Sequence, residues 1–351
     1  MIPLLTGDLP GTGGLTRVAE EDFRVEEIPL YEAAGSGEHL YLTVEKKGRT
    51  TPEVARELAQ LLKMRERDVG TAGLKDKRGV TVQRMSIASK LAPEEARKLS
   101  GNGWRVVDAS RHNNKLRPGH LRGNRFRIVV RGVGPDGLAR AEAISARIEA
   151  SGVANLFGPQ RFGKYGDNAD LGRKILLRDP AAARAARDRF LRRMALSALQ
   201  SELFNRCLEE RLRDGLFETA IEGDVLRKRA TGGLFVCEDP PADTPRVQSQ
   251  EVDPAGPLPG HSIFAARGVA LEREQAVLKG AEIDPASFAA GGGEMEGARR
   301  PYRIPVEELR VESEGPDALA LWFALPKGSY AISVLREIVK AQEFDRAAEW
   351  G

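Results

Sequence analysis

The chain has 351 residues, of which 41% are hydrophobic and 30% are charged, and its formal net charge is +3. That length and apolar content are enough for two domains, or for one large domain that carries an insertion, around a sizeable core. The mild net charge does not by itself point to a nucleic-acid partner, so the distribution of charge matters more than its total.

Cysteine usage and hydropathy limit the compartment. The two cysteines, Cys207 and Cys237, form no C-x-x-C pair, so neither a zinc site nor a disulfide framework is expected. Residues 1–10 lack the basic start and apolar core of a signal peptide, and no apolar run is long enough to span a bilayer. We therefore expect a protein of the reducing cytoplasm that has no membrane partner.

Positive charge is concentrated in two stretches. Residues 104–131 contain eight Lys or Arg and one acid, Asp108, and residues 161–193 contain ten Lys or Arg and four Asp. Acidic residues dominate elsewhere, as in residues 238–243 and 251–253. Such segregation predicts a basic face for a polyanion, although solvated helix faces explain the second stretch equally well.

The first elements read as two strands and a helix. Residues 11–14 are rich in glycine, but no Gly-Lys-Ser/Thr follows, so they are not a P-loop. Residues 23–28 and 39–44 alternate like strands, and the glycine turn between them predicts an antiparallel neighbouring pair. Thr50-Thr51-Pro52-Glu53 is typical of a helix start with a capping box. This helix should run to about Met64 and bury one stripe: Val54, Leu58, Leu61 and Leu62.

The next stretch, residues 73–83 (GLKDKRGVTVQ), encloses one carboxylate among cations. Alternation over residues 80–87 predicts a strand, so Asp76 should lie on a tight loop that enters a sheet. Three nearby cations, Lys75, Lys77 and Arg78, would favour the ionised carboxylate that a nucleophile requires. On composition alone, an ordinary polar turn in which Asp76 pairs with a lysine is the favoured interpretation.

Further strands and helices alternate up to residue 150. We expect a short helix at 93–99, a strand at 104–109, a basic loop at 112–119 and a strand at 123–131. The last strand should direct its apolar side chains to one face and its arginines to the other. Residues 136–150 should form a helix that buries Leu138, Ala141, Ile144 and Ile148.

The second half has a different character. Residues 181–212 read as long arginine-rich helices with one apolar stripe (Leu196, Leu199, Leu203 and Cys207), which makes Cys207 a core residue. Residues 239–260, rich in proline and acid, predict a loop, and the triple glycine at 291–293 predicts a break. An apolar strand should span 318–325, followed by a helix with Ser329 as N-cap. The side chains expected to cover the sheet are Ala331, Val334, Leu335, Ile338 and Val339.

Few chemical signatures are present. The four histidines are scattered, so no metal site is expected. No Gly-x-Ser-x-Gly elbow of a serine hydrolase appears. A glycosidase-like carboxylate pair is not singled out, although the sequence does not exclude one. The remaining candidates for function are Asp76 among its cations, the basic stretches and several aromatic residues on turns.

Residues 73–83 resemble the signature of the TruD family of tRNA pseudouridine synthases, and other stretches match that family in the same order. The matching stretches are 21–27 (EDFRVEE), 37–39 (GEH), 123–126 (GNRF), 157–163 (FGPQRFG), 196–198 (LSA) with 203–205 (LFN), and 325–331 (LPKGSYA). The chain departs from the family beside two of these stretches. It has Ala331-Ile332 where many members have Ala-Thr, and Ala154-Asn155-Leu156 where a Pro-Asn-Tyr-like run is frequent.

The resemblance implies an α+β protein with the pseudouridine synthase fold, built on a mixed, mainly antiparallel sheet, plus an inserted α+β TRUD-type domain. The implied catalytic domain is discontinuous, at 1–153 and 300–351, with the insertion at 154–299. The implied activity is isomerisation of a uridine, typically uridine 13 in the tRNA D arm, without cofactor. The implied partner is tRNA, with no obligate protein partner.

The same resemblance makes Asp76 the nucleophile and places Phe23, Asn124, Phe126 and Tyr330 around the base. A target base must be flipped out of its stack, and aromatic rings can return part of that energy. Without the resemblance, Phe23 and Phe126 are equally natural core residues, and Asn124 is equally natural in a turn.

Other basic residues are candidates for helping Asp76 and for holding RNA. We expect Arg17 to orient Asp76 by an ion pair, although an exposed arginine would be ordinary there. Lys75 should assist Asp76 or contact phosphate. Further phosphate contacts are expected at Arg161, Arg192 and Arg193, in a basic cleft between the domains.

Two other functional classes remain open from the residues alone. An RNA-binding or RNA-chaperone protein without catalysis would have the same basic stretches but would not need Asp76. An enzyme that acts on a small molecule, such as a glycosidase, would need a second essential carboxylate near Asp76 and would work without RNA.

Overall fold

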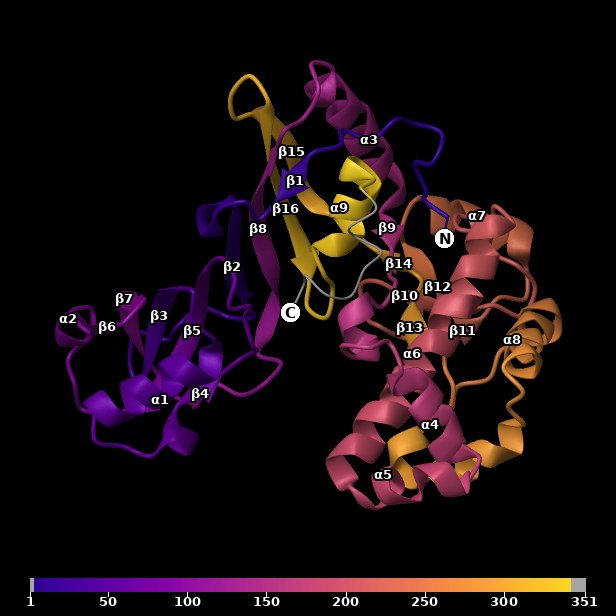
Figure 1. Ribbon diagram of the computed structural model, residues 1–351, viewed down its shortest axis with the longest axis horizontal. Helices are drawn as coiled ribbons and strands as arrows, with labels where there is room; N and C mark the ends of the chain where they lie inside the picture. Colours follow the sequence, from indigo (N-terminus) through magenta and orange to yellow (C-terminus); the bar gives the residue numbers. More distant parts are fainter. Residues whose placement is uncertain (1–2, 342–351) are drawn as a thin grey trace.

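The computed structural model describes residues 3–341 and shows two sheet-based bodies side by side (Figure 1). The larger sheet has ten strands in the order β15-β16-β8-β2-β5-β3-β7-β6, with β1 paired to β8 and β4 to β5. Its strands are β1 (Leu15–Thr16), β2 (Phe23–Pro29), β3 (His39–Lys47), β4 (Gly70–Thr71), β5 (Val80–Ala88), β6 (Ser100–Gly101), β7 (Trp104–His112), β8 (Leu121–Arg131), β15 (Glu307–Ser313) and β16 (Ala318–Pro326). Among the described strands only β2 and β5 pair in parallel. The expected α+β class with a mixed, mainly antiparallel sheet is therefore confirmed.

The expected pairing of the first two long strands is wrong. Strand β5 lies between β2 and β3, parallel to β2 and antiparallel to β3. Its ladder with β3 extends from His39↔Ala88 to Lys47↔Val80. The connection between β2 and β3, residues 30–38, is much longer than a tight hairpin turn and does not force the strands together. A strand that arrives later in the sequence can therefore insert between them.

Helix α1 (Thr51–Leu61) begins as its sequence predicts. The Thr50 side chain accepts from the Glu53 N–H, and the Glu53 carboxylate accepts from the Thr50 N–H at 2.6 Å, which completes a capping box. The helix ends three residues before the expected Met64. Its buried stripe continues from Leu58 to the partly buried Leu62, which leaves Leu61 52% exposed, contrary to expectation. Helix α2 (Pro93–Ala96) follows as a single turn.

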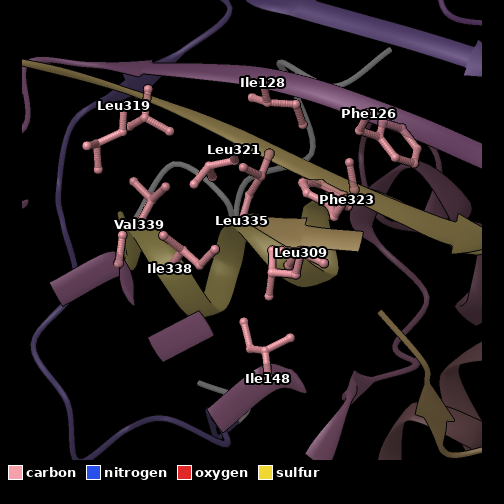
Figure 2. Packing of buried hydrophobic residues seen from close by; sticks show 14 of the residues in the cluster. Phe126, Ile128, Ile148, Leu309, Leu319, Leu321, Phe323, Leu335, Ile338 and Val339 are labelled. Carbon is pink, nitrogen blue, oxygen red and sulfur yellow. The ribbon is translucent and has the colours of Figure 1, made fainter. Parts of the chain in front are cut away.

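Helices α3 (Gly137–Ser151) and α9 (Ile332–Val339) cover one face of the large sheet around β8 and β16. Figure 2 shows Leu335, Ile338 and Val339 of α9 packed beneath the apolar side chains of these strands, with Ile148 of α3 beyond them. The predicted buried sets of both helices are confirmed, except that Leu138 is only partly buried. The predicted cap of α9 is wrong, because Ser329 closes a turn over residues 326–329 and the N-cap is Ala331.

The second body combines helices with a four-stranded sheet of order β11-β10-β12-β13. The long helix α6 buries Leu196, Leu199, Leu203 and Cys207 as expected. The helices and strands of the second body are α4 (Asn168–Leu176), α5 (Ala183–Arg187), α6 (Arg189–Arg213), β10 (Val225–Lys228), β11 (Leu234–Val236), α7 (Pro240–Gln248), β12 (Val252–Leu258), α8 (Gly268–Gly280) and β13 (Ala298–Pro301). The predicted break at 291–293 falls inside a 3-10 segment, Pro285–Met295, where Gly292 has φ 60° and is not helical.

The loop expected at 239–260 is wrong, because it contains helix α7 and strand β12. Asp239 caps α7 by accepting from the Ala242 N–H, and two prolines occupy the first turn, where no donor is required. In β12, Pro254 accepts from the Tyr302 N–H through its carbonyl alone. These three prolines therefore stand at positions that do not need the missing N–H, whereas Pro245 lies inside α7 and removes one intrahelical donor.

The chain passes between the two bodies at a short ribbon. Strand β9 (Val153–Ala154) pairs with β14 (Arg303–Ile304), so the outgoing and returning segments lie side by side. Residues 1–2 and 342–351 of the expected catalytic domain lie outside the described residues. No helix in residues 3–341 is both long enough and apolar enough to cross a membrane.

The core beneath α9 gives a stability prediction. Leu335 is fully buried, so Leu335→Ala should lower the free energy of unfolding by about 2–5 kcal/mol through lost burial and a residual cavity. The exposed Leu61 is the matched control, and Leu61→Ala should change the free energy of unfolding by less than about 0.5 kcal/mol. Urea unfolding of both variants measures the difference, and equal effects would contradict this packing.

Candidate active site

Asp76 lies on the loop between β4 and β5, shortly before β5 enters the large sheet. Its side chain is 52% exposed. The loop re-enters the sheet at Gly79, which has a φ of 131°. A Cβ atom at this position would lie 2.5 Å from the Phe23 carbonyl oxygen, so only glycine fits. The loop is thereby held against the first residue of β2.

The cations around Asp76 differ from the sequence expectation. The Lys75 ammonium lies 2.9 Å from Glu27 in a buried ion pair, and Lys77 is directed to Glu53 at 4.0 Å. These two lysines therefore pair with other carboxylates, and Lys75 attaches the loop to β2. Arg17 pairs with Asp76 instead, with 3.3 Å between guanidinium and carboxylate.

Arg17 is held in a specific position. Its backbone has φ 57°, its side chain is 13% exposed, and its guanidinium carbon lies 3.9 Å from the centroid of the Phe23 ring. Burial lowers the pKa of Arg17, and the negative charge of Asp76 opposes that decrease. The guanidinium thus connects the exposed carboxylate to an aromatic ring in the pocket.

A pocket of about 490 Å³ opens beside Asp76 and is lined by all of the predicted site residues. Its volume lies in the range of small-ligand pockets. Its walls come from the Asp76 loop, β2, β8, the 157–161 segment and the turn before α9. The predicted site residues that it brings together are Arg17, Phe23, Lys75, Asp76, Asn124, Phe126 and Tyr330.

The aromatic residues of the pocket play unequal parts. Phe23 and Phe126 are buried, and their ring centroids are 6.3 Å apart in an edge-to-face arrangement. Phe126 also stacks on Phe323 of β16 at 5.2 Å, so it belongs to the core as well as to the pocket wall. Tyr330 also lines the pocket and is 48% exposed, so its ring is accessible to a ligand.

Asn124 presents an unsatisfied acceptor. It lies on β8 two residues before Phe126 and therefore shares its face of the strand. Its Oδ1 atom is buried, and no residue within 3–341 donates a hydrogen bond to it. Buried polar atoms in folded proteins are nearly always paired, so this oxygen marks a place where a ligand N–H would be favourable.

Sequence reasoning missed several residues of the pocket. Gln160 and Lys327 line the pocket. Both lie in stretches that match the family, but neither was predicted to belong to the site. Arg300 of β13 lies 4.3 Å from the Phe157 ring centroid and donates to the Gly328 carbonyl at 3.4 Å. It thus joins the second body to the Tyr330 turn, and nothing in its local sequence signals this contact.

The three expected phosphate contacts lie in different settings. Arg161 lines the pocket, where Ser197 and Ser201 of α6 accept its hydrogen bonds. Arg193 is exposed on α6. Arg192 is bound internally to Glu294 at 2.6 Å and to the Ala290 and Gly291 carbonyls, so its side chain serves the packing of the second body. Within residues 3–341, no cluster of three His, Cys, Asp or Glu side chains is arranged to hold a metal ion.

Comparisons with known proteins identify similar chains over nearly the whole length. The family model for tRNA pseudouridine synthase D (TruD) matches residues 2–186 and 179–338. A tRNA pseudouridine synthase D from Anaeromyxobacter sp. (strain Fw109-5) is 54% identical over 341 residues, which cover 97% of this chain and 96% of the relative. A tRNA pseudouridine synthase D from Thermus thermophilus is 44% identical over 345 residues, covering 98% of this chain and 93% of the relative.

A solved structure shows the same fold. The crystal structure of a protein described as the putative tRNA pseudouridine synthase D (TruD) from Methanosarcina mazei superposes with a TM-score of 0.80. The two sequences are 25% identical, and the match covers 97% of this chain and 96% of that chain.

Proposed function

This chain belongs to the TruD family of tRNA pseudouridine synthases, and we propose that it isomerises uridine 13 in the tRNA D arm with Asp76 as the nucleophile. The family establishes the reaction class, an isomerisation of uridine in tRNA. The target position and the residue roles are the proposal. The observation that carries them is one pocket whose lining combines an exposed, arginine-paired carboxylate, aromatic rings and an unsatisfied amide oxygen.

The pocket suits a flipped pyrimidine. Taking a base out of its stack costs a few kcal/mol, and stacking on an aromatic side chain returns about 1–3 kcal/mol. Tyr330 is the accessible ring, whereas Phe23 and Phe126 form the apolar wall behind the base. The Asn124 Oδ1 atom can accept from the uracil N3–H, which cytosine lacks, and this difference favours uridine.

Asp76 is suited to attack because it is accessible, lines the pocket and is oriented by Arg17, whose guanidinium lies 3.3 Å from one carboxylate oxygen. That positive charge favours the ionised carboxylate that attack requires. The reaction breaks the bond between ribose C1′ and N1, turns the uracil, and joins C5 to C1′. The C5 proton is lost and N1 gains one, so atoms and electrons balance without a redox partner. No cofactor is therefore needed.

The tRNA should bind across the boundary between two domains. We place the catalytic domain at 1–153 and 300–351 and the inserted domain at 154–299, because, apart from the last two residues of β13, the ten-stranded sheet and the four-stranded sheet draw their strands from these two parts. The second boundary falls within β13 (Ala298–Pro301), which pairs with β12. Arg161, which reaches the pocket from the inserted part, is the favoured phosphate contact, with tRNA as the partner.

Pseudouridine mapping tests the target position. An unmodified tRNA transcript that contains uridine 13 should gain one pseudouridine at that position when incubated with the protein, and a transcript with cytidine 13 should gain none. Nucleotide-resolution detection by carbodiimide labelling reads out both transcripts. Modification of the cytidine 13 transcript at another uridine would overturn the assignment to position 13 while leaving the enzyme class intact.

A further inference from the structure

A buried lysine, Lys46, lies beneath the Asp76 loop at the end of β3. Alternate residues of this strand, Leu40, Leu42 and Val44, are fully buried in the core beneath α1. Lys46 continues the same face and is only 1% exposed. A lysine at such a position is unfavourable unless its charge and donors are satisfied.

The Lys46 ammonium is satisfied by three backbone carbonyls. It donates to Arg49 at 2.7 Å, Asp76 at 2.8 Å and Lys75 at 3.3 Å. Two of these acceptors belong to the loop that carries the carboxylate, and the third directly precedes the cap of α1. The Lys75 N–H also donates to the Thr51 side chain at 3.0 Å. The loop is therefore held from below against the start of α1, while its carboxylate remains exposed.

We propose that Lys46 is a positioning residue for the reaction: its protonated amine fixes the backbone of Lys75 and Asp76 and so sets the direction of the Asp76 carboxylate. This inference rests on the proposed role of Asp76. Lys46 contacts main-chain oxygens and neither the carboxylate nor the pocket. Its three donors match the three acceptors, and this match explains why a charged residue is buried there.

The protonation state of Lys46 should couple the loop to pH. Burial lowers the pKa of Lys46 to about 8; the charges of Asp76 and Glu53 oppose that decrease, and Lys75 adds to it. Below this pH the ammonium donates three hydrogen bonds, and above it the amine has two donors and a lone pair that faces a carbonyl. Because the folded-state pKa lies below the ordinary value, the unfolded chain binds more protons between the two, so deprotonation does not weaken the fold. Loop order and rate should fall through pH 8 while global stability does not.

The test compares two adjacent lysines under single-turnover conditions with saturating tRNA. Lys46→Met should lower the rate of pseudouridine formation about 10- to 100-fold without weakening tRNA affinity, because a carboxylate displaced by about 1 Å loses up to that factor. It should also remove the rate decrease centred near pH 8 that is expected of the wild type. Lys47→Met is the control, since Lys47 is exposed and pairs with Glu21; its rate and pH profile should match the wild type.

A wild-type rate for Lys46→Met, or an equal loss in both variants, would overturn the proposal. An inactive Asp76→Asn alongside an unaffected Lys46→Met would reject the role of Lys46 alone, whereas an active Asp76→Asn would reject the nucleophile. If Lys46→Met does not fold, amide exchange of residues 73–79 in the wild-type protein decides, after correction for intrinsic rates. Protection that falls through pH 8 relative to β3 supports the proposal, and constant protection rejects it.

Discussion

Replacement of Asp76 by asparagine is expected to lower the single-turnover rate of pseudouridine formation by at least about 10⁴-fold, because loss of a catalytic nucleophile has effects of this size. Asparagine keeps the size and polarity of the side chain, and the anchors of the loop are its main chain and Lys75. The fold and the pocket should therefore persist, and tRNA affinity should remain within a few-fold of the wild type. Rapid-quench assays and filter binding measure these two quantities.

Asp108 provides the matched control. It is also an exposed aspartate paired with an arginine, Arg97 at 3.0 Å, but it lies on β7, away from the pocket. Asp108→Asn should have the wild-type rate. Product formation by Asp76→Asn at the wild-type rate would refute the nucleophile, and a comparable loss in Asp108→Asn would show that the effect is not specific to the site.

Much of the fold could be predicted from local patterns. The alternation of β5 and β8, the capping box of α1 and the stripe of α6 each depend on neighbours within a few residues, which the sequence displays directly. The wrong predictions of the fold concerned either pairing between strands that are distant in sequence or a stretch that is rich in proline. The insertion of β5 between β2 and β3 depends on which distant strand pairs best. In 239–260 two prolines occupy a helix start and Pro254 pairs within a strand, while α7 forms despite Pro245 in its interior.

The site could be predicted in its members but not in its connections. Motif resemblance named residues that the structure brings to one pocket. It did not show that Lys75 and Lys77 turn to Glu27 and Glu53, because those carboxylates come from β2 and α1, far away in sequence. The Lys46 contact did have a local signal, since a lysine on the apolar face of an alternating strand needs an explanation.

Arg17 gives the second large expected effect. Arg17→Met should reduce the single-turnover rate about 10²- to 10³-fold, because it removes the guanidinium that pairs with Asp76 and leaves the carboxylate free to rotate. If Arg17 orients Asp76, the loss should fall on the rate at saturating tRNA. If it instead binds a phosphate, the loss should fall on affinity and on the salt dependence of binding. Measurement of both at several salt concentrations separates the two roles.

The planar guanidinium makes a graded test possible. Arg17 pairs with Asp76 and also covers the Phe23 ring, whereas a lysine at this position keeps the charge but loses the stacked plane. Arg17→Lys should therefore recover part of the rate, and Arg24→Met is the control, since Arg24 pairs with Glu45 at 3.0 Å outside the pocket. If the ring contact contributes, Phe23→Leu should reduce the wild-type rate more than it reduces the rate of Arg17→Lys. Equal rates for Arg17→Met and the wild type would remove Arg17 from the mechanism and leave the direction of the carboxylate to its loop alone.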